Sequence, residues 1–296
     1  MSHLDDEADI EASRAPLLDH LVELRKRLII CSLALVVGFL ACFAFSQQIA
    51  TFLLHPYAVA QSLVATQNAA GGKEDGVKLL LALIGKGTVS AEASKFVTTG
   101  PLEFFFAKVR LAFFGAIGIT FPVLAWQLYR FVAPGLYKRE RAAFLPFLIA
   151  SPVLFVMGAA LVYYVMLPFV LWFSLKQQVF GGAGQISVQL LPKIEDYMGL
   201  VETLMLAFGL CFQLPVIVAL LGMAGLVNAR MLSQGRRYAI VGVFVVAAVV
   251  TPPDPISMIS LALPICLLYE VSIWCVALID LRRKREDQST DIVPTS

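Results

Sequence analysis

The chain has 296 residues, of which 59% are hydrophobic and only 15% carry a charged side chain. Its formal net charge at pH 7 is +2 and its mean hydropathy is +0.80. This composition excludes a water-soluble globular domain and is typical of an integral membrane protein surrounded by lipid, and no nucleic-acid partner is expected.

Six apolar runs predict transmembrane helices, because crossing a bilayer core of about 30 Å takes roughly 20 apolar residues in a helix. The runs lack the alternation of a membrane barrel, and an open strand would leave backbone groups unpaired in lipid. We expect one six-span membrane domain over residues 1–296, with tails at 1–27 and 280–296. The spans are predicted at Leu28–Phe45, Leu111–Tyr129, Phe144–Leu167, Leu200–Met223, Tyr238–Val250 and Ile256–Ile279.

Proline placement and span length predict a distorted bundle. The fifth span, from Tyr238 to Val250, gives only about 20 Å of helix at 1.5 Å per residue. Local thinning of the membrane or coverage by partner helices would accommodate it. We therefore predict an all-α integral membrane protein, a bundle of six kinked transmembrane helices, with spans five and six short or tightly paired. Four prolines inside spans are expected to cause the kinks: Pro122, Pro152, Pro215 and Pro264.

The basic residues predict that both termini are cytoplasmic. With the N-terminus inside, the segments on that side hold 15 of the 23 lysines and arginines. Six of the other eight lie in a long outer loop between spans one and two, where charge has little effect on orientation. Its apolar stretch Val77–Ile84 is expected at the membrane interface. A leucine stripe around Leu21 predicts a further interfacial helix, which leads into span one.

The sequence shows no set of residues suited to catalysis, metal binding or cofactor binding. Its three histidines, His3, His20 and His55, lie outside the predicted spans, and no acidic cluster stands at ligand spacing. The bundle offers no paired nucleophile and base, which an intramembrane hydrolase needs. Gly85–Thr88 resembles a fragment of a phosphate loop but lacks its full spacing. We expect no enzyme, no catalytic or metal site and no cofactor.

Two acidic residues on the predicted cytoplasmic side are candidates for ligand binding. Glu23 lies one helical turn before Arg27, and Glu140 stands among three basic residues of the second cytoplasmic segment. Local charge pairing, which is weak at an exposed surface, is one explanation of both positions. The other is that the two carboxylates bind guanidinium groups of a ligand bidentately.

Three polar residues are predicted inside spans. Glu202 and Gln213 are 11 residues apart on span four, which is about three turns, so they share one helical face. Glu270 lies in the middle of span six. Polar side chains at such depth line cavities or bond to neighbouring helices. Each is therefore expected to make either an internal hydrogen bond or a contact with a partner helix.

A series of motifs extends over nearly the whole chain: His20–Leu28, Gly100–Phe104, Pro122, Phe131–Arg141, Ala207–Gly209, Phe212–Pro215 and Thr251–Asp254. In this order they resemble the motifs of the TatC proteins of the twin-arginine protein translocase. Some members of that family carry Glu where this chain has Gln213, so a neutral hydrogen bond is expected there.

The resemblance implies a receptor and core subunit that binds twin-arginine signal peptides of folded cargo on the cytoplasmic face. It implies that Glu23 and Glu140 accept the two arginines, with Arg25 and Phe131 beside them. Further motif residues that the resemblance singles out are Pro101, Glu103, Pro134, Tyr137, Arg141, Pro252 and Asp254.

The resemblance also implies partners and a location. Spans five and six would dock single-span TatA- and TatB-type proteins, and Gln213, with Glu202 and Glu270 as further candidates, would contact a partner helix. The protein would be a multi-pass component of the bacterial cell inner membrane and a homo-oligomer within a larger complex. Export would be driven by the proton motive force, since the chain offers no nucleotide site.

Two other classes of function stay open. A secondary transporter for a small solute would have two related halves and a buried ionisable site at broken helices, and no such repeat is visible. A purely structural membrane scaffold would leave Glu23 and Glu140 insensitive to mutation. Export of a folded reporter protein separates these alternatives.

Overall fold

The computed structural model is a bundle of helices and describes residues 2–69, 96, 100–132, 138–176, 192–250 and 255–290. Within this part, six helical segments are long and apolar enough to cross a membrane, which confirms the prediction of an all-α protein with six spans. These segments are Leu21–Ala44, Glu103–Phe131, Phe147–Lys176, Ile194–Met223, Ala229–Val250 and Met258–Leu281.

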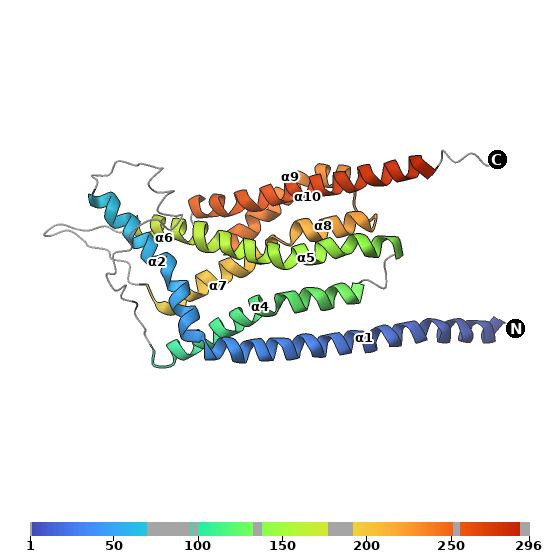
Figure 1. Ribbon diagram of the computed structural model, residues 1–296, viewed down its shortest axis with the longest axis horizontal. Coiled ribbons are helices and arrows are strands. Elements are labelled where there is room, and N and C mark those ends of the chain that lie inside the picture. The colour runs from blue at the N-terminus through green and yellow to red at the C-terminus, as the bar shows by residue number, and fades with distance from the viewer. Residues whose placement is uncertain are drawn as a thin grey trace.

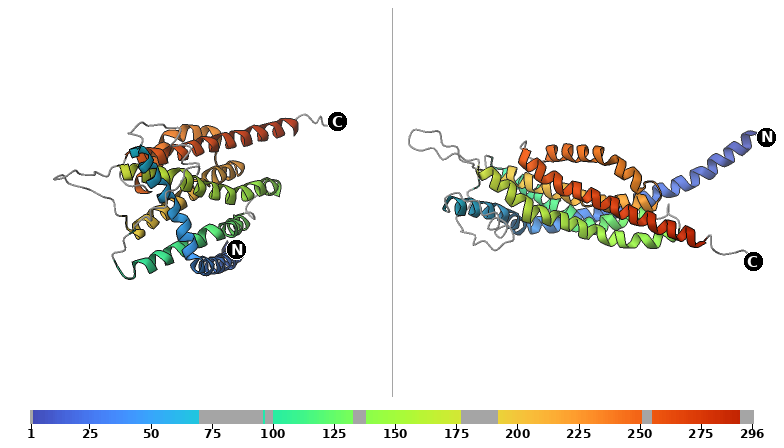
Figure 2. Two further views of the ribbon diagram at one scale, coloured as in Figure 1. Left: turned by 60° about the vertical axis from the view of Figure 1, so that its left-hand side comes forward. Right: turned by 90° about the horizontal axis from the view of Figure 1, so that it is seen from above.

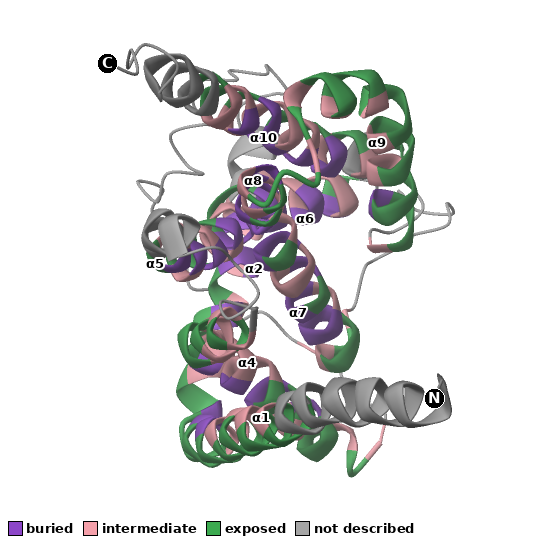
Figure 3. Ribbon diagram, turned by 90° about the vertical axis from the view of Figure 1, so that its right-hand side faces the viewer, coloured by how far each residue is buried: buried purple, intermediate pink, exposed green. Residues whose placement is uncertain are grey.

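The helices pack side by side in an order that differs from their order in the chain (Figure 1). From one edge of the bundle to the other, the helices lie in the order α1, α4, α7, α5 with α8, and then α10 with α9. The two outer helices, α1 and α9, expose most of their surface (Figure 3). Their bounds are α1 Ser2–Ala44, α4 Glu103–Val132, α5 Lys138–Leu161, α7 Ile194–Cys211, α8 Leu214–Met223, α9 Ala229–Val250 and α10 Pro255–Thr290.

Helix α1 is continuous for 43 residues, from Ser2 to Ala44. The segment with the leucine stripe thus leads into span one as part of the same helix, and its position at the membrane interface stays a prediction. In Figures 1 and 2 the N-terminal part of α1 projects beyond the bundle. It projects from the end at which α10 also finishes, so the first and last described helices meet the solvent at one end of the molecule.

A helix that was not predicted follows α1 directly. This helix, α2 (Ser46–Ala69), crosses the far end of the bundle and packs against α6. The segment was expected to be loop, because its glutamines and Pro56 interrupt the apolar pattern. Span two also begins earlier than predicted, at Glu103 rather than Leu111. The apolar stretch Val77–Ile84 lies outside the described residues.

The helical geometry is disturbed at two prolines. In the third span a π-helical turn, η3 (Val162–Met166), separates α5 from α6 (Leu167–Lys176) and ends two residues before Pro168. In the fourth span α7 ends at Cys211 and α8 begins at Leu214, with Pro215 in its first turn. Proline has no N–H for the helical ladder and its ring displaces the preceding turn, so breaks are expected at both places.

The fifth span is longer than predicted. Helix α9 has 22 residues and starts at Ala229, nine residues before the apolar run that begins at Tyr238. The sequence estimate was wrong because hydropathy falls at the arginines of its first turns, while the helix itself continues. The prediction that spans five and six are tightly paired is confirmed, since α9 and α10 lie side by side (Figures 1 and 2).

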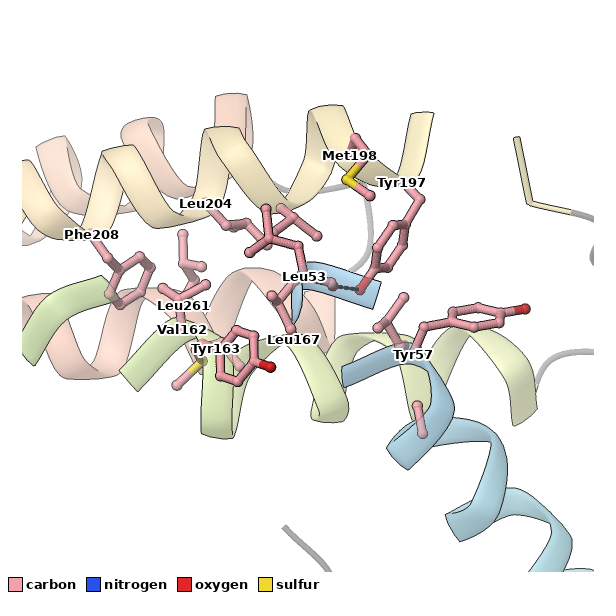
Figure 4. Close-up of a cluster of buried hydrophobic side chains, with 14 of the residues drawn as sticks. Leu53, Tyr57, Val162, Tyr163, Leu167, Tyr197, Met198, Leu204, Phe208 and Leu261 are labelled. Atoms are coloured by element: carbon pink, nitrogen blue, oxygen red, sulfur yellow. Dashed lines mark hydrogen bonds between the residues drawn. The ribbon is translucent and has the colours of Figure 1, made fainter. Parts of the chain in front are cut away.

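Small residues let the helices approach closely. A Cβ on Gly115 of α4 would lie 2.9 Å from Cys42 Sγ of α1, and a Cβ on Gly209 of α7 would lie 2.6 Å from the Phe155 ring of α5. Interfaces of this kind allow van der Waals packing between helices where lipid gives no hydrophobic driving force. The largest buried cluster, shown in part in Figure 4, joins α2, η3, α6, α7 and α10.

Candidate functional site

The acidic residue Glu23 lies on α1, at the start of the candidate span Leu21–Ala44. Its carboxylate is paired with the guanidinium of Arg27, one turn further along α1. The Arg27 side chain is only 13% exposed, whereas Glu23 is 37% exposed. The local pairing that the sequence suggested is therefore present, and the Glu23 side chain remains partly exposed. Arg25 is exposed on the same helix.

The other residues expected at this site belong to helices that reach the same end. Phe131 is partly buried in the last turn of α4, and Glu140 is in the first turn of α5. Figure 1 shows the C-terminal end of α4 and the N-terminal end of α5 close to each other, at the end from which α1 projects. The fold thus brings the C-terminal end of α4 and the N-terminal end of α5 to the end of the bundle beyond which α1 projects. The side chains of Glu140 and Arg141 lie outside the described part of the structure.

The remaining motif residues have structural positions or fall outside the description. Glu103 is the first residue of α4, and its Oε2 accepts a hydrogen bond of 2.9 Å from the Gly100 N–H. This closes the turn that contains Pro101 and satisfies a donor at the start of a helix. Pro134, Tyr137, Pro252 and Asp254 lie outside the described residues.

Gln213 has an internal partner in the neighbouring helix. Its Nε2 donates to the Ser151 carbonyl oxygen at 2.9 Å, and its Oε1 accepts from the Ser151 hydroxyl at 2.7 Å. Both residues are buried. A neutral hydrogen bond was the expectation, and the partner is Ser151 of α5. Sequence reasoning missed Ser151, because one serine in an apolar run gives no signal of its own.

Glu202 has a different partner. Its Oε2 lies 2.7 Å from Nε of Arg110 on α4, while Glu202 itself is only 3% exposed. Glu202 and Gln213 therefore do not form one polar stripe, because they face different helices and α7 ends between them. Arg110 is one of the six basic residues expected in the long outer loop, but it lies on α4, and the acid that neutralises it stands 92 positions later in the sequence.

Glu270 also makes an internal contact. Its Oε2 accepts from Nη2 of Arg236 on α9 at 2.9 Å, and the two side chains are 41% and 46% exposed. The adjacent Tyr269 hydroxyl donates to the Leu232 carbonyl oxygen of α9 at 2.9 Å. These bonds tie α10 to α9 along the paired fifth and sixth spans.

A groove of about 690 Å³ lies between α2 and η3. Among the described residues, its lining includes no carboxylate, lysine or arginine. The residues that line the groove are Gln47, Gln48, Thr51, Phe52, His55, Tyr163 and Tyr164.

Comparison with known proteins identifies the family of this chain. The model of the family described as Sec-independent protein translocase protein (TatC) matches residues 19–264. The chain belongs to the TatC family. A TatC protein of Magnetococcus marinus is 38% identical over 280 residues, which covers 95% of this chain and 89% of that protein. One from Helicobacter pylori is 35% identical, with 88% of each chain covered.

Solved structures agree with this assignment. Two crystal structures described as the twin-arginine translocase receptor TatC match with TM-scores of 0.65 and 0.67 and identities of 29% and 30%. They cover 87% and 86% of this chain, and 97% and 98% of the respective structures. As a TatC protein, the chain is a multi-pass bacterial membrane protein and a component of a protein translocase rather than an enzyme.

Proposed function

We propose that this TatC protein is the signal-peptide receptor of the twin-arginine translocase, and that it binds the paired arginines of folded cargo proteins at Glu23 and Glu140. The observation that carries the proposal is the meeting of the C-terminal end of α4 and the N-terminal end of α5 at the end of the bundle beyond which α1 projects, with a partly exposed carboxylate side chain on α1. In this proposal that end faces the cytoplasm of a bacterial inner membrane, as the positive-inside rule predicts.

The pairing of Glu23 with Arg27 is compatible with ligand binding. An ion pair between residues four apart on a helix stabilises by about 0.2–0.5 kcal/mol. Hydrogen bonds to a charged group contribute about 1.5–3 kcal/mol, and a guanidinium that binds both carboxylate oxygens is at the strong end. A signal-peptide arginine therefore displaces Arg27 at small cost, and Arg27 holds the carboxylate in place until then.

Lysine is a poorer ligand for the same site. Its ammonium group is a single strongly hydrated charge, whereas guanidinium presents a planar fork that matches a carboxylate. A receptor with two carboxylates thus discriminates a pair of arginines from a pair of lysines by geometry. In the complete translocase, peptide binding would lead to recruitment of TatA- and TatB-type helices at α9 and α10, with the proton motive force as the energy source.

The test is binding of a fluorescent twin-arginine signal peptide to the purified protein in detergent. We expect Glu23→Ala with Glu140→Ala to weaken binding at least 10-fold, which corresponds to about 1.4 kcal/mol. A twin-lysine peptide should bind the wild type weakly. The matched control is Glu195→Ala with Asp196→Ala, which removes two exposed acids at the opposite end of the bundle.

The control variant changes the net charge by the same amount, so it separates a local site from general electrostatic attraction. Equal losses in both double variants would show attraction by overall charge and contradict the site. Wild-type binding by the Glu23/Glu140 variant would exclude these carboxylates. Failure of the wild type to bind, in the presence of its partner proteins, would contradict the receptor function itself.

A further inference from the structure

The groove between α2 and η3 begins where the first candidate span ends. That span finishes at Ala44, and α2 starts two residues later and crosses this end of the bundle (Figure 1). Gln47 and Gln48, in the first turn of α2, line the groove. The end of an apolar span marks the boundary between the hydrocarbon core and the headgroups of a bilayer. The groove therefore opens at headgroup depth, at the other end of the span from Glu23.

One wall of the groove consists of aromatic rings in a fixed arrangement. The rings of Phe52 and Tyr163 are stacked with their centroids 4.4 Å apart, and the Tyr163 hydroxyl donates to the Phe52 carbonyl oxygen at 2.8 Å. Tyr164 lies edge-on to Tyr163, with a centroid separation of 4.9 Å. Phe52 and Tyr164 are 54% and 57% exposed. Because the face of an aromatic ring carries partial negative charge, these two exposed rings attract a cation.

The remaining lining residues, all on α2, supply hydrogen-bond donors. Gln47, Gln48 and His55 are exposed, and carboxamide and imidazole N–H groups donate to phosphate oxygens. The Thr51 hydroxyl donates instead to the Gln47 carbonyl oxygen of its own helix, at 2.9 Å. The described part of the lining holds no carboxylate, lysine or arginine. The groove therefore suits a ligand that carries both an anionic and a cationic group and has no net charge.

An apolar stripe continues from the groove toward the middle of the membrane. Val153, Val156 and Met157 of α5 stand 11, 8 and 7 residues before Tyr164, so they share its helical face. All three are exposed. Val153 lies about 16 Å along the helix from Tyr164. This distance is close to half of the hydrocarbon core of about 30 Å, so the stripe matches one acyl chain in one leaflet.

We propose that the groove between α2 and η3 binds a phospholipid whose headgroup carries an ammonium group. The α2 donors bind its phosphate, the rings of Phe52 and Tyr164 hold its ammonium group, and one acyl chain lies along the α5 stripe. An anionic headgroup without an ammonium group gains nothing from the rings and brings a negative charge that the described lining does not neutralise. The inference depends on the membrane location of the chain and not on its proposed receptor function.

The experiment is native mass spectrometry of the full-length protein in detergent, titrated with phosphatidylethanolamine or with phosphatidylglycerol of identical acyl chains. We expect one saturable phosphatidylethanolamine per chain, with a Kd about 5-fold lower than that of phosphatidylglycerol, the effect of a cation on an aromatic ring. Phe52→Leu combined with Tyr164→Leu should abolish this preference, because leucine keeps an apolar surface and removes the rings. His55→Ala should weaken binding of both lipids, since both contain the phosphate.

The matched control is Phe105→Leu combined with Phe106→Leu. It removes two exposed rings from the first turns of α4, and it should leave the preference for phosphatidylethanolamine unchanged. All the replaced side chains are exposed, so the variants are expected to fold, and thermal unfolding of each checks this. Equal affinity of the wild type for the two lipids would overturn the proposal. So would a preference that survives in the Phe52/Tyr164 variant, or one that the control variant loses equally.

A photoreactive lipid tests the location of the site. Phosphatidylethanolamine with a diazirine in one acyl chain is added to the protein in phosphatidylglycerol vesicles, and the labelled residues are identified by peptide mapping. We expect labelling to concentrate on Val153–Tyr164 and to fall about 5-fold in the Phe52/Tyr164 variant. Labelling spread evenly over the exposed helices would show a lipid that only surrounds the protein, and would overturn the site.

Discussion

The hydroxyl of Tyr163 donates a hydrogen bond of 2.8 Å to the carbonyl oxygen of Phe52. Phe52 lies four residues before Pro56, whose missing N–H would otherwise have bonded to that carbonyl. The next carbonyl, that of Leu53, accepts from the Tyr197 hydroxyl at 2.7 Å (Figure 4). Two tyrosines from the third and fourth spans therefore compensate for the proline in α2 and attach this helix to the bundle.

Removal of the Tyr163 hydroxyl is expected to destabilise the protein through this carbonyl. Tyr163→Phe should lower the free energy of unfolding by about 1–3 kcal/mol, since it leaves a partly buried acceptor unpaired. Pro56→Ala restores the backbone N–H, so the loss caused by Tyr163→Phe should be smaller in that background. Denaturant unfolding in detergent measures the four variants of this cycle. Strictly additive effects would contradict the compensation.

The close approach of α5 and α7 at Gly209 gives a second prediction. Gly209→Ala should destabilise by about 1–3 kcal/mol, because its Cβ would lie 2.6 Å from the Phe155 ring and the core would be overpacked. Gly118→Ala in α4 is the matched control, since a Cβ there meets nothing within 4 Å. It should be neutral or slightly stabilising. Thermal unfolding of both variants measures the change in stability, and equal changes in Gly209→Ala and Gly118→Ala would exclude overpacking as the cause.

Five of the six spans could be predicted because each contains an apolar run of the required length, and the fifth was expected although its run, Tyr238–Val250, is short. The ends of the helices could not, because apolar runs stop at charges while helices continue. At the start of span two, Lys108 and Arg110 mark the end of the apolar pattern, yet α4 begins at Glu103. Helix α2 was not predicted, because its stability depends on distant residues rather than on an apolar run. It is held by bonds from Tyr163 and Tyr197, which lie more than 100 positions away in the sequence.

The sequence offers candidate site residues where the local pattern is unusual. An isolated acid among basic residues and an acid four positions before an arginine make Glu140 and Glu23 candidates, and their role in ligand binding stays a prediction. The partners of Gln213 and Glu202 were not predictable. Ser151 and Arg110 are partners of the fourth span only because α5 and α4 pack against it. Local sequence patterns do not show which helices pack together, so these pairs could not be predicted.

The hydrogen bonds between Gln213 and Ser151 are expected to couple the two residues energetically. Gln213→Leu and Ser151→Ala should each destabilise, and a double-mutant cycle should give a coupling of about 0.5–1.5 kcal/mol, the range of polar contacts between membrane helices. Signal-peptide binding should be unaffected, because the pair is internal. Additive losses would show that the pair contributes no mutual stabilisation. Normal stability with lost function would show that Gln213 acts on a partner instead.

The start of α9 gives the last prediction. The Ala229 N–H donates to Oδ2 of Asp280 on α10 at 3.0 Å, and the Met231 N–H donates to Oδ1 of Asn228 at 2.8 Å. One cap is therefore local and the other comes from the paired helix. Asp280→Ala should cost about 0.5–2 kcal/mol, as the loss of a cap does. Asp280→Asn keeps an acceptor and loses only the favourable charge at the helix N-terminus, worth about 0.3–1 kcal/mol.

Hydrogen exchange of the backbone amides of Ala229 and Met231 distinguishes the two caps. Asp280→Ala should raise exchange at Ala229 more than at Met231, and Asn228→Ala should do the reverse. Asp280→Asn should fall between Asp280→Ala and the wild type at Ala229. If Asp280→Ala left exchange at Ala229 unchanged, the bond from α10 would not hold the start of α9, and the pairing of the two helices would depend on Glu270, Arg236 and Tyr269 instead.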